Sequence, residues 1–468
     1  MQYFSTRGEG SPLSFKETIL TGLARDGGLF LPESIPDVSD KLDSWRYMTY
    51  SDLALEIMRL YADDIPDSAL RAIIDKSYGV FRHEEVTPVV EVGPIYILEL
   101  FHGPTLAFKD VALQFLGNLF EYCLEENKEE MNILAATSGD TGSAAIYGVR
   151  GRERIRIFVL HPNGRVSDVQ ERQMTSVLDD NVFNIGLTGT FDDCQNIVKE
   201  LFCDLEFRDK YKLGSVNSIN WARVLAQVVY YFYAAFRVQE KTGAKQLRFS
   251  VPTGNFGDIF AGYVARQMGL PVDKLVVATN ENDILSRYFN TGVYSLGAVT
   301  PTLSPSMDIQ VVSNFERYLY YLSGNDPVLL KQWMAELRSS GSIEIKRDPK
   351  DELFVAGRGD TEMTIATIRE YWEKYAYLLD PHTAVGVAVA SQFMHPDIPM
   401  IALATAHPAK FNDAIIQATG EDIAHHELVE ELADLPTQKE LLAADRDVVA
   451  EFVRSRIEAG GKNANGDL

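Results

Sequence analysis

The chain has 468 residues, a length that favours two or three domains over a single core. Hydrophobic residues make up 46% and charged residues 24%, as in ordinary globular proteins. The net charge of −23 argues against binding to nucleic acid or to an anionic membrane, because both would repel the chain, although a local cationic pocket could still hold a small anionic substrate.

The first 85 residues predict a small helical unit. Apolar side chains recur at helical spacing from Phe15 to Leu23 and again from Leu53 to Leu60, and the turn Asp26-Gly27-Gly28 lies between the two stretches. No catalytic cluster is visible in this part of the chain.

From about residue 90, short apolar runs alternate with glycine-rich turns and helical stretches. We expect strands at 133–136, 155–160, 182–187, 247–251, 275–278 and 400–404, and helices at 144–149, 192–202 and 259–268. This alternation predicts an α/β fold with mostly parallel sheets, in which ligands bind at the carboxyl ends of the strands.

The expected domains follow from the same pattern. They are a helical unit at 1–85, a small α/β domain at 131–214, a large α/β domain at 86–130 and 215–435, and a C-terminal helix and tail at 436–468. Residues 301–360 suggest helices, with a turn at 347–351, and could form an insertion in the large domain. The small, polar residues 460–468 are expected to fray.

Cysteine usage and the chain start bear on the compartment. Cys123, Cys194 and Cys203 are odd in number and lack CxxC spacing, which indicates a reduced, cytoplasmic protein with buried, apolar cysteines. We expect no signal peptide and no membrane span, because no apolar run approaches roughly 18 residues. The sequence leaves the oligomeric state open.

Lys109, in the segment 99–110, is the strongest candidate for a catalytic residue. An amine becomes a covalent catalyst when it condenses with a carbonyl, and pyridoxal phosphate is the carbonyl most often used. Such a lysine needs a strand-to-helix turn for the phosphate and a partner for the pyridine nitrogen. The segments 251–258 and 404–411 are candidates for these two parts.

Three motifs follow expected strands, and each also has an ordinary structural interpretation. Gly254, Asn255, Phe256 and Gly257 would turn backbone N–H groups toward an anion, but many strand-to-helix turns look alike. The segment 137–143 offers Ser138, Asp140 and Thr141 for a carboxylate, or Ser138 or Asp140 as a helix cap. The Thr405 hydroxyl could bind a neutral pyridine nitrogen, or simply end a strand.

Other chemistries have little support. His102 and His407 flank the site motifs, and a structural role is the likelier interpretation of each. The chain contains no HExxH, no GxSxG and no ordered Cys/His spacing, so neither a metal site nor a serine triad is predicted.

Together, the motifs resemble the threonine synthase family, in its longer bacterial and fungal branch. The similarity covers nearly the whole chain in the family's order. It lies in Tyr3-Phe-Ser-Thr-Arg-Gly, the segment 22–32, Phe101-His-Gly-Pro-Thr-Leu-Ala-Phe-Lys109-Asp110, the segment 136–144, Val216-Asn-Ser-Ile-Asn-Trp-Ala-Arg223 with Gln227, the segment 252–257 and the segment 404–411.

The resemblance implies a fold type II pyridoxal-phosphate lyase of threonine biosynthesis, which converts O-phospho-L-homoserine and water to L-threonine and phosphate. Lys109 would carry the cofactor, and Gly254, Asn255, Phe256 and Gly257 would bind its phosphate. Thr405 would contact the pyridine nitrogen, and Ser138, Asp140 and Thr141 would hold the substrate carboxylate. Asp140 departs from the asparagine common in related enzymes, which puts its role in doubt, because two carboxylates repel.

The substrate phosphate needs cations, and motif position ranks Arg223 first, then Arg165 and Lys410. A surface ion pair of Arg223 on an amphipathic helix is the competing interpretation. Two rival functions stay open: a phospho-lyase that releases 2-ketobutyrate from the same substrate, and a non-catalytic relative that binds metabolites. Retention of Lys109 argues against the second.

Overall fold

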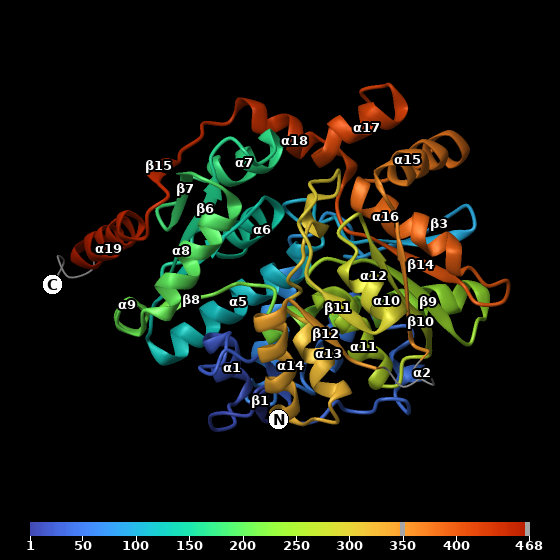
Figure 1. Cartoon of the computed structure of the whole chain (residues 1–468), viewed down its shortest axis with the longest axis horizontal. Coiled ribbons are helices and arrows are strands. Elements are labelled where there is room, and N and C mark those ends of the chain that lie inside the picture. Colours follow the sequence, from blue (N-terminus) through green and yellow to red (C-terminus); the bar gives the residue numbers. More distant parts are fainter. Residues whose placement is uncertain (347–351, 464–468) are drawn as a thin grey trace. The chain divides into compact units, whose positions relative to one another are not determined.

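The computed structural model describes residues 1–346 and 352–463 (Figure 1). The turn predicted at 347–351 and the last residues of the tail lie outside this range. The chain forms two compact units: unit 1 contains residues 1–19, 23–112 and 218–425, and unit 2 contains residues 20–22, 113–217 and the chain from His426 onward. The N-terminal residues thus belong with the larger unit and the C-terminal ones with the smaller. The four domain ranges expected from the sequence remain a prediction.

The first 80 residues are helical, as predicted, with a small sheet added. Helices α1 (Phe15–Thr21), α2 (Leu42–Trp45), α3 (Tyr50–Met58) and α4 (Asp67–Tyr78) accompany β1 (Tyr3–Ser5), which pairs antiparallel with β2 (Phe30–Pro32). Thr49 caps α3 by accepting a hydrogen bond from the N–H of Asp52. Tyr50 packs edge-on against Tyr78 at 5.0 Å between ring centroids, which holds α3 to α4.

Unit 1 is built on a six-stranded sheet in the order β13-β10-β9-β14-β4-β3. All neighbouring pairs are parallel except β3 with β4. The strands are β3 (Val89–Val92), β4 (Ile95–Glu99), β9 (Leu247–Pro252), β10 (Val272–Thr279), β13 (Phe354–Arg358) and β14 (Met400–Ala404). Because β4, β9 and β14 run the same way, the segments that follow them emerge at one edge of the sheet.

Helices cover both faces of this sheet, as a parallel sheet requires. Ser250 of β9 donates to the carbonyl of Gly386 in α16 (Pro381–Ala390), whereas the ring of its neighbour Phe249 lies 5.0 Å from Tyr231 in α10 (Trp221–Thr242). Successive strand residues point to opposite faces. One face therefore packs on α16 with α15 (Thr361–Tyr375) and α17 (Asn412–Thr419), and the other on α10 with α11 (Gly257–Gln267).

Residues 280–346 include helix α12 (Ile284–Thr291), which packs against β13 and β10 of the main sheet. They also form α13 (Phe315–Leu322) and α14 (Pro327–Ser340), and β11 (Val293–Ser295) pairs antiparallel with β12 (Ser342–Glu344). The helices expected in 301–360 are present. The same region also supplies β13, an outer strand of the main sheet.

Unit 2 contains a five-stranded parallel sheet in the order β15-β7-β6-β5-β8. The strands are β5 (Met131–Ala136), β6 (Ile155–Pro162), β7 (Val182–Thr188), β8 (Leu213–Gly214) and β15 (Glu440–Ala443). Its core lies between the sheet and the helices α8 (Phe191–Cys203) and α19 (Arg446–Asn463). The other helices are α5 (Lys109–Asn127), in which the unit boundary falls, α6 (Asp140–Val149), α7 (Asp168–Thr175), α9 (Leu205–Lys210) and α18 (Glu427–Glu431).

The predicted α/β fold with mostly parallel sheets is confirmed, and each strand expected from the sequence is present. The cysteine prediction holds for Cys123 and Cys194, which are buried, but not for Cys203, which is exposed at the end of α8. None of the described helices is both long and apolar enough to cross a bilayer.

Candidate functional site

Lys109 is the first residue of α5, and its side chain is 7% exposed. Its Nζ donates to Ser306 Oγ at 3.3 Å. The residues just before it pair with the segment after β14: Phe108 N–H donates to the carbonyl of Thr405 (2.8 Å), and His407 N–H donates to that of Leu106 (3.0 Å). The lysine motif and the threonine motif, some 300 residues apart in sequence, are thus directly hydrogen-bonded.

A buried carboxylate shapes the turn before Lys109. Asp110 accepts hydrogen bonds from the N–H (2.8 Å) and the hydroxyl (2.7 Å) of Thr105. Burial raises the pKa of Asp110 to about 6, although the bonds from Thr105 and the charge of Lys410 oppose the rise. Lys410 Nζ donates to the Thr105 carbonyl at 2.8 Å and is 2% exposed, so this cation supports the lysine segment.

The glycine-rich turn joins β9 to α11. Phe256 precedes the helix with φ +64°, and no described side chain caps the helix start. The Phe256 ring is buried among Phe289, Phe315, Tyr318 and Phe354 and anchors the turn. A Cβ on Gly254 would lie 2.6 Å from the Ser306 carbonyl oxygen, so this turn passes directly against the residue that contacts Lys109.

Asn314 supports this turn from the start of α13. Its backbone N–H and its Nδ2 both donate to the Asn255 carbonyl at 3.1 Å. Its Oδ1 accepts from Arg317, whose guanidinium also donates to the carbonyls of Phe30 (3.0 Å) and Ile219 (2.5 Å). Burial lowers the pKa of Arg317 to about 9, and the group is still a cation at neutral pH.

Thr405 follows β14 and is 6% exposed. Its N–H donates to Thr383 Oγ1 at 3.2 Å, and the Thr383 hydroxyl donates to Asp380. Asp380 caps the start of α16, and its Oδ1 lies 2.9 Å from His382 Nδ1. The sequence motifs do not include Ser306, Asn314, Arg317, Asp380 or His382. An aspartate followed by proline at 380–381 is a helix-start signal that could have drawn attention to the last two.

Arg223 differs from its predicted setting. Helix α10 is buried along most of its length, and Arg223 is 4% exposed, so a surface ion pair is wrong. Burial lowers the pKa of Arg223 to about 10, and Tyr230 opposes the shift.

In unit 2, the segment 137–143 turns from β5 into α6. The predicted cap by Ser138 or Asp140 is wrong: Thr137 Oγ1 accepts the N–H groups of Gly139 (3.0 Å) and Gly142 (2.9 Å). Ser138 is exposed, and Asp140 is buried with its Oδ1 accepting from Gln170 Nε2 at 2.8 Å. Gly139 has φ +149°, and a Cβ there would collide with Gln170. Arg165 is exposed.

Both flanking histidines have structural partners, as expected. His102 Nε2 lies 2.8 Å from Glu99, which also accepts from the hydroxyl of Tyr377. His407 Nδ1 accepts the N–H of Ala409 at 3.2 Å and so caps a short turn.

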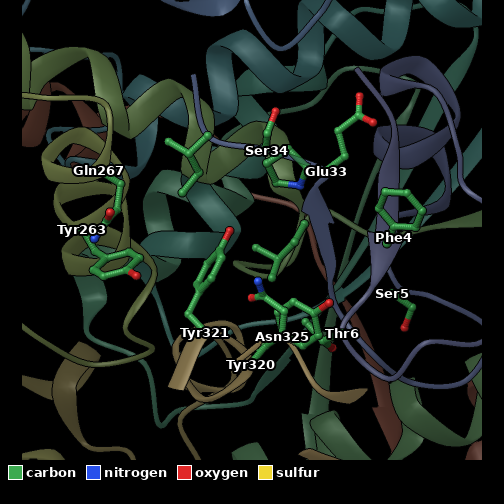
Figure 2. A pocket seen from close by; sticks show the side chains of 13 residues that line it. Phe4, Ser5, Thr6, Glu33, Ser34, Tyr263, Gln267, Tyr320, Tyr321 and Asn325 are labelled. Carbon is green, nitrogen blue, oxygen red and sulfur yellow. The ribbon is translucent and has the colours of Figure 1, made fainter. Parts of the chain in front are cut away.

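A separate hollow of about 510 Å³ opens between the N-terminal segment and the helices α11 and α13 (Figure 2). Phe4, Ser5 and Thr6 line one side, Tyr263 and Gln267 the other, and Tyr320, Tyr321 and Asn325 complete the wall. It includes no predicted site residue. Among residues 1–346 and 352–463, no group of histidine, cysteine and acidic side chains is arranged to hold a metal.

Unit 1 contains the kinds of groups that pyridoxal phosphate needs. A buried amine can condense with its aldehyde, and a helix start without a side-chain cap can accept its phosphate. The close approach of Gly254 to Ser306 leaves no room for a Cβ between the phosphate turn and the lysine contact.

Comparison with known proteins agrees with this chemistry. The family model "Threonine synthase N terminus" matches residues 2–78, "Pyridoxal-phosphate dependent enzyme" matches 80–329, and "Threonine synthase, C-terminal" matches 383–453. The threonine synthase of Saccharomyces cerevisiae is 46% identical, with 97% of each chain covered. That of Methylobacillus glycogenes is also 46% identical, over 98% of this chain and all of its own. The crystal structure of PLP-bound threonine synthase from Brucella melitensis superposes with a TM-score of 0.93 at 46% identity, covering 97% of this chain and 99% of that one.

Proposed function

This chain belongs to the threonine synthase family of pyridoxal-phosphate-dependent lyases, with their fold type II architecture, and we propose that it converts O-phospho-L-homoserine and water to L-threonine and phosphate. The observation that carries the proposal is the contact between three distant segments. Lys109 Nζ bonds to Ser306, Ser306 lies against Gly254, and the residue before Lys109 bonds to Thr405.

In this proposal, Lys109 holds the cofactor and the four residues Gly254, Asn255, Phe256 and Gly257 bind its phosphate through their backbone N–H groups. The Thr405 hydroxyl contacts the pyridine nitrogen and leaves it neutral. When bound, pyridoxal phosphate supplies a carbonyl for the substrate amine and a conjugated ring that accepts electron density from the α-carbon.

The protein's own groups then handle protons and charge. Lys109 Nζ would be the base that takes the α-proton and then the β-proton, and it would return protons to the γ-carbon and finally to the α-carbon. Phosphate leaves from the γ-carbon with the electrons of the broken C–O bond, the oxygen of water bonds to the β-carbon, and the proton that water loses goes to the leaving phosphate. Arg223 is the first candidate to stabilise the phosphate, because a buried arginine presents a bidentate fork to phosphate oxygens.

The substrate carboxylate is assigned to Ser138 and Thr141 with the backbone of α6. The bond from Gln170 supports a structural role for the Asp140 carboxylate, which joins α6 to α7. Arg165 and Lys410 rank behind Arg223, and Lys410 is further weakened by its bond to Thr105. The proposal includes a cytoplasmic location, no nucleic-acid or membrane partner, and the domain boundaries predicted above.

The test is a balance of products. The protein loaded with pyridoxal phosphate is incubated with O-phospho-L-homoserine, and threonine, inorganic phosphate and 2-ketobutyrate are measured. Equal amounts of threonine and phosphate are expected, and loss of both in Lys109→Ala by several orders of magnitude. Phosphate released with 2-ketobutyrate in place of threonine would identify a phospho-lyase instead.

A further inference from the structure

A hydrogen-bond chain, buried except at Ser306, connects Lys109 with Thr405 inside unit 1. Lys109 Nζ donates to Ser306 Oγ (3.3 Å), and the backbone N–H of Ser306 donates to His382 Nε2 (3.2 Å). His382 Nδ1 lies 2.9 Å from Asp380 Oδ1, and the Thr383 hydroxyl donates to Asp380 Oδ2. Thr383 Oγ1 accepts the N–H of Thr405 at 3.2 Å. The Asp380 carboxylate is thus connected to Lys109 through His382 and Ser306, and to Thr405 through Thr383.

This arrangement selects one form of His382. Because Nε2 accepts a hydrogen bond from Ser306, the ring proton must reside on Nδ1, where it is donated to Asp380. Asp380 is 1% exposed and also accepts the backbone N–H groups of His382 (2.9 Å) and Thr383 (3.3 Å) at the start of α16. The helix start stabilises its negative charge. The ring of Phe411, 4.8 Å away and edge-on, holds the imidazole in place.

The segment that carries Ser306 is fixed on its other side. Asp308 accepts hydrogen bonds from Thr302 N–H (2.9 Å) and hydroxyl (2.7 Å), and from the side-chain amides of Asn280 (2.8 Å) and Asn282 (2.9 Å). This pins the loop around the short turn Pro305–Met307. The bond to His382 then sets the position of Ser306 itself.

We propose that Asp380 and His382 are a positioning pair for Lys109. By fixing His382 as an acceptor, Asp380 holds Ser306 where its hydroxyl accepts a hydrogen bond from the lysine amine. That contact orients the Lys109 amine toward the carbonyl with which it condenses. Ser306 touches the reacting amine, whereas Asp380 and His382 act through Ser306. The inference rests on the proposed role of Lys109 as the cofactor lysine.

Two substitutions of His382 distinguish the hydrogen bond at Nδ1 from the one at Nε2. His382→Asn keeps a donor near Nδ1 for Asp380 but does not reach Ser306. His382→Gln brings an amide oxygen toward the place of Nε2. Ser306→Ala removes the hydroxyl, and Ser391→Ala, which removes a hydroxyl bond to the Ala388 carbonyl at the far end of α16, is the matched control.

The experiment uses the cofactor-free protein. Pyridoxal phosphate is added at a series of pH values, the product is reduced with borohydride, and labelled Lys109 is measured over time by peptide mass spectrometry. Because the amine condenses in its neutral form and a neutral hydrogen bond is worth about 0.5–1.5 kcal/mol, Ser306→Ala and His382→Asn should label roughly 2–13-fold more slowly. His382→Gln should recover most of the rate, and Ser391→Ala should match the wild type.

Equal labelling rates in Ser306→Ala, His382→Asn and the wild type would overturn the positioning role and leave Lys109 as the cofactor lysine. Label on a different lysine in the wild type would instead overturn the proposed function. Urea unfolding is measured on every variant. If His382→Asn fails to fold, Ser306→Ala decides the question, because Ser306 is only half-buried and its backbone bond to His382 is retained.

Discussion

Gly254→Ala tests the phosphate turn directly. The added Cβ would meet the Ser306 carbonyl oxygen at 2.6 Å, a distance that real Cβ contacts essentially never show. The obstacle is backbone, which cannot rotate away as a long side chain can. Overpacking of this kind costs about 1–3 kcal/mol, and because 1.36 kcal/mol is tenfold, binding of pyridoxal phosphate should weaken by roughly 5–150-fold.

The assay compares the affinities of pyridoxal phosphate and pyridoxal for the Gly254→Ala variant and for a control glycine variant. Cofactor-free protein is titrated with pyridoxal phosphate and with pyridoxal, which lacks the phosphate, and the ratio of their affinities isolates the phosphate contribution. Gly359→Ala is the control, because a Cβ there has ordinary contacts at 3.5–3.6 Å. The variant should lose much of the preference for the phosphate ester, and the control should keep it. An unchanged preference in Gly254→Ala would refute the phosphate role of this turn.

Three further predictions concern Thr405, Arg223 and Asp258. Thr405→Val should lower kcat about tenfold and shift the cofactor absorption, since a neutral hydrogen bond is worth about 0.5–1.5 kcal/mol, whereas Thr405→Ser should be close to wild type. Arg223→Met keeps much of the buried volume but removes the charge. Since a charge-assisted hydrogen bond is worth roughly 1.5–3 kcal/mol, this variant should lower kcat/KM at least about tenfold and should weaken inhibition by inorganic phosphate. Equal inhibition of the variant and the wild type would show that Arg223 is not the phosphate ligand. Burial raises the pKa of Asp258 to about 6 from its usual 3.8, so the native state binds the proton more tightly than the unfolded chain, and stability from this group is gained as pH falls from about 6 toward 4. Urea unfolding should therefore show the wild type gaining on Asp258→Asn by up to about 3 kcal/mol between pH 7 and pH 4, and a constant difference would contradict it.

The parts of the site that follow strands could be found from the sequence. Lys109, Gly254 and Thr405 each lie in a short motif whose local pattern predicts a strand end or a helix start, and such positions share one edge of a parallel sheet. Ser306 and Asn314 could not be found in this way. Their partners, Lys109 and Asn255, lie some 200 and 60 residues away, and residues 301–360 carry no periodicity that would indicate the contact.

Two local predictions failed because tertiary structure decided them. The segment 137–143 offers several capping side chains, and the choice of Thr137 follows from Gly139 at φ +149°, a conformation that a sequence pattern does not specify. The competing interpretation of Arg223, an ion pair on the helix surface, is wrong because Arg223 is buried. The helix α10 instead packs against α3 on one side and α11 on another, so its polar residues are buried as well.

The N-terminal segment offers a reason for keeping a charge inside unit 1. A buried guanidinium is costly unless its donors are satisfied, and Arg317 is fully buried. It donates to the carbonyls of Phe30 and Ile219 and to the Asn314 side chain, and it lies over the ring of Trp221 at 5.7 Å. Its neighbour Glu316 accepts two hydrogen bonds from Arg7. Since Asn314 in turn holds the Asn255 carbonyl, the N-terminal segment supports the turn at 254–257 through α13. This offers a structural reason why a family model matches residues 2–78, which carry no catalytic motif: they support the turn that is proposed to bind the cofactor phosphate.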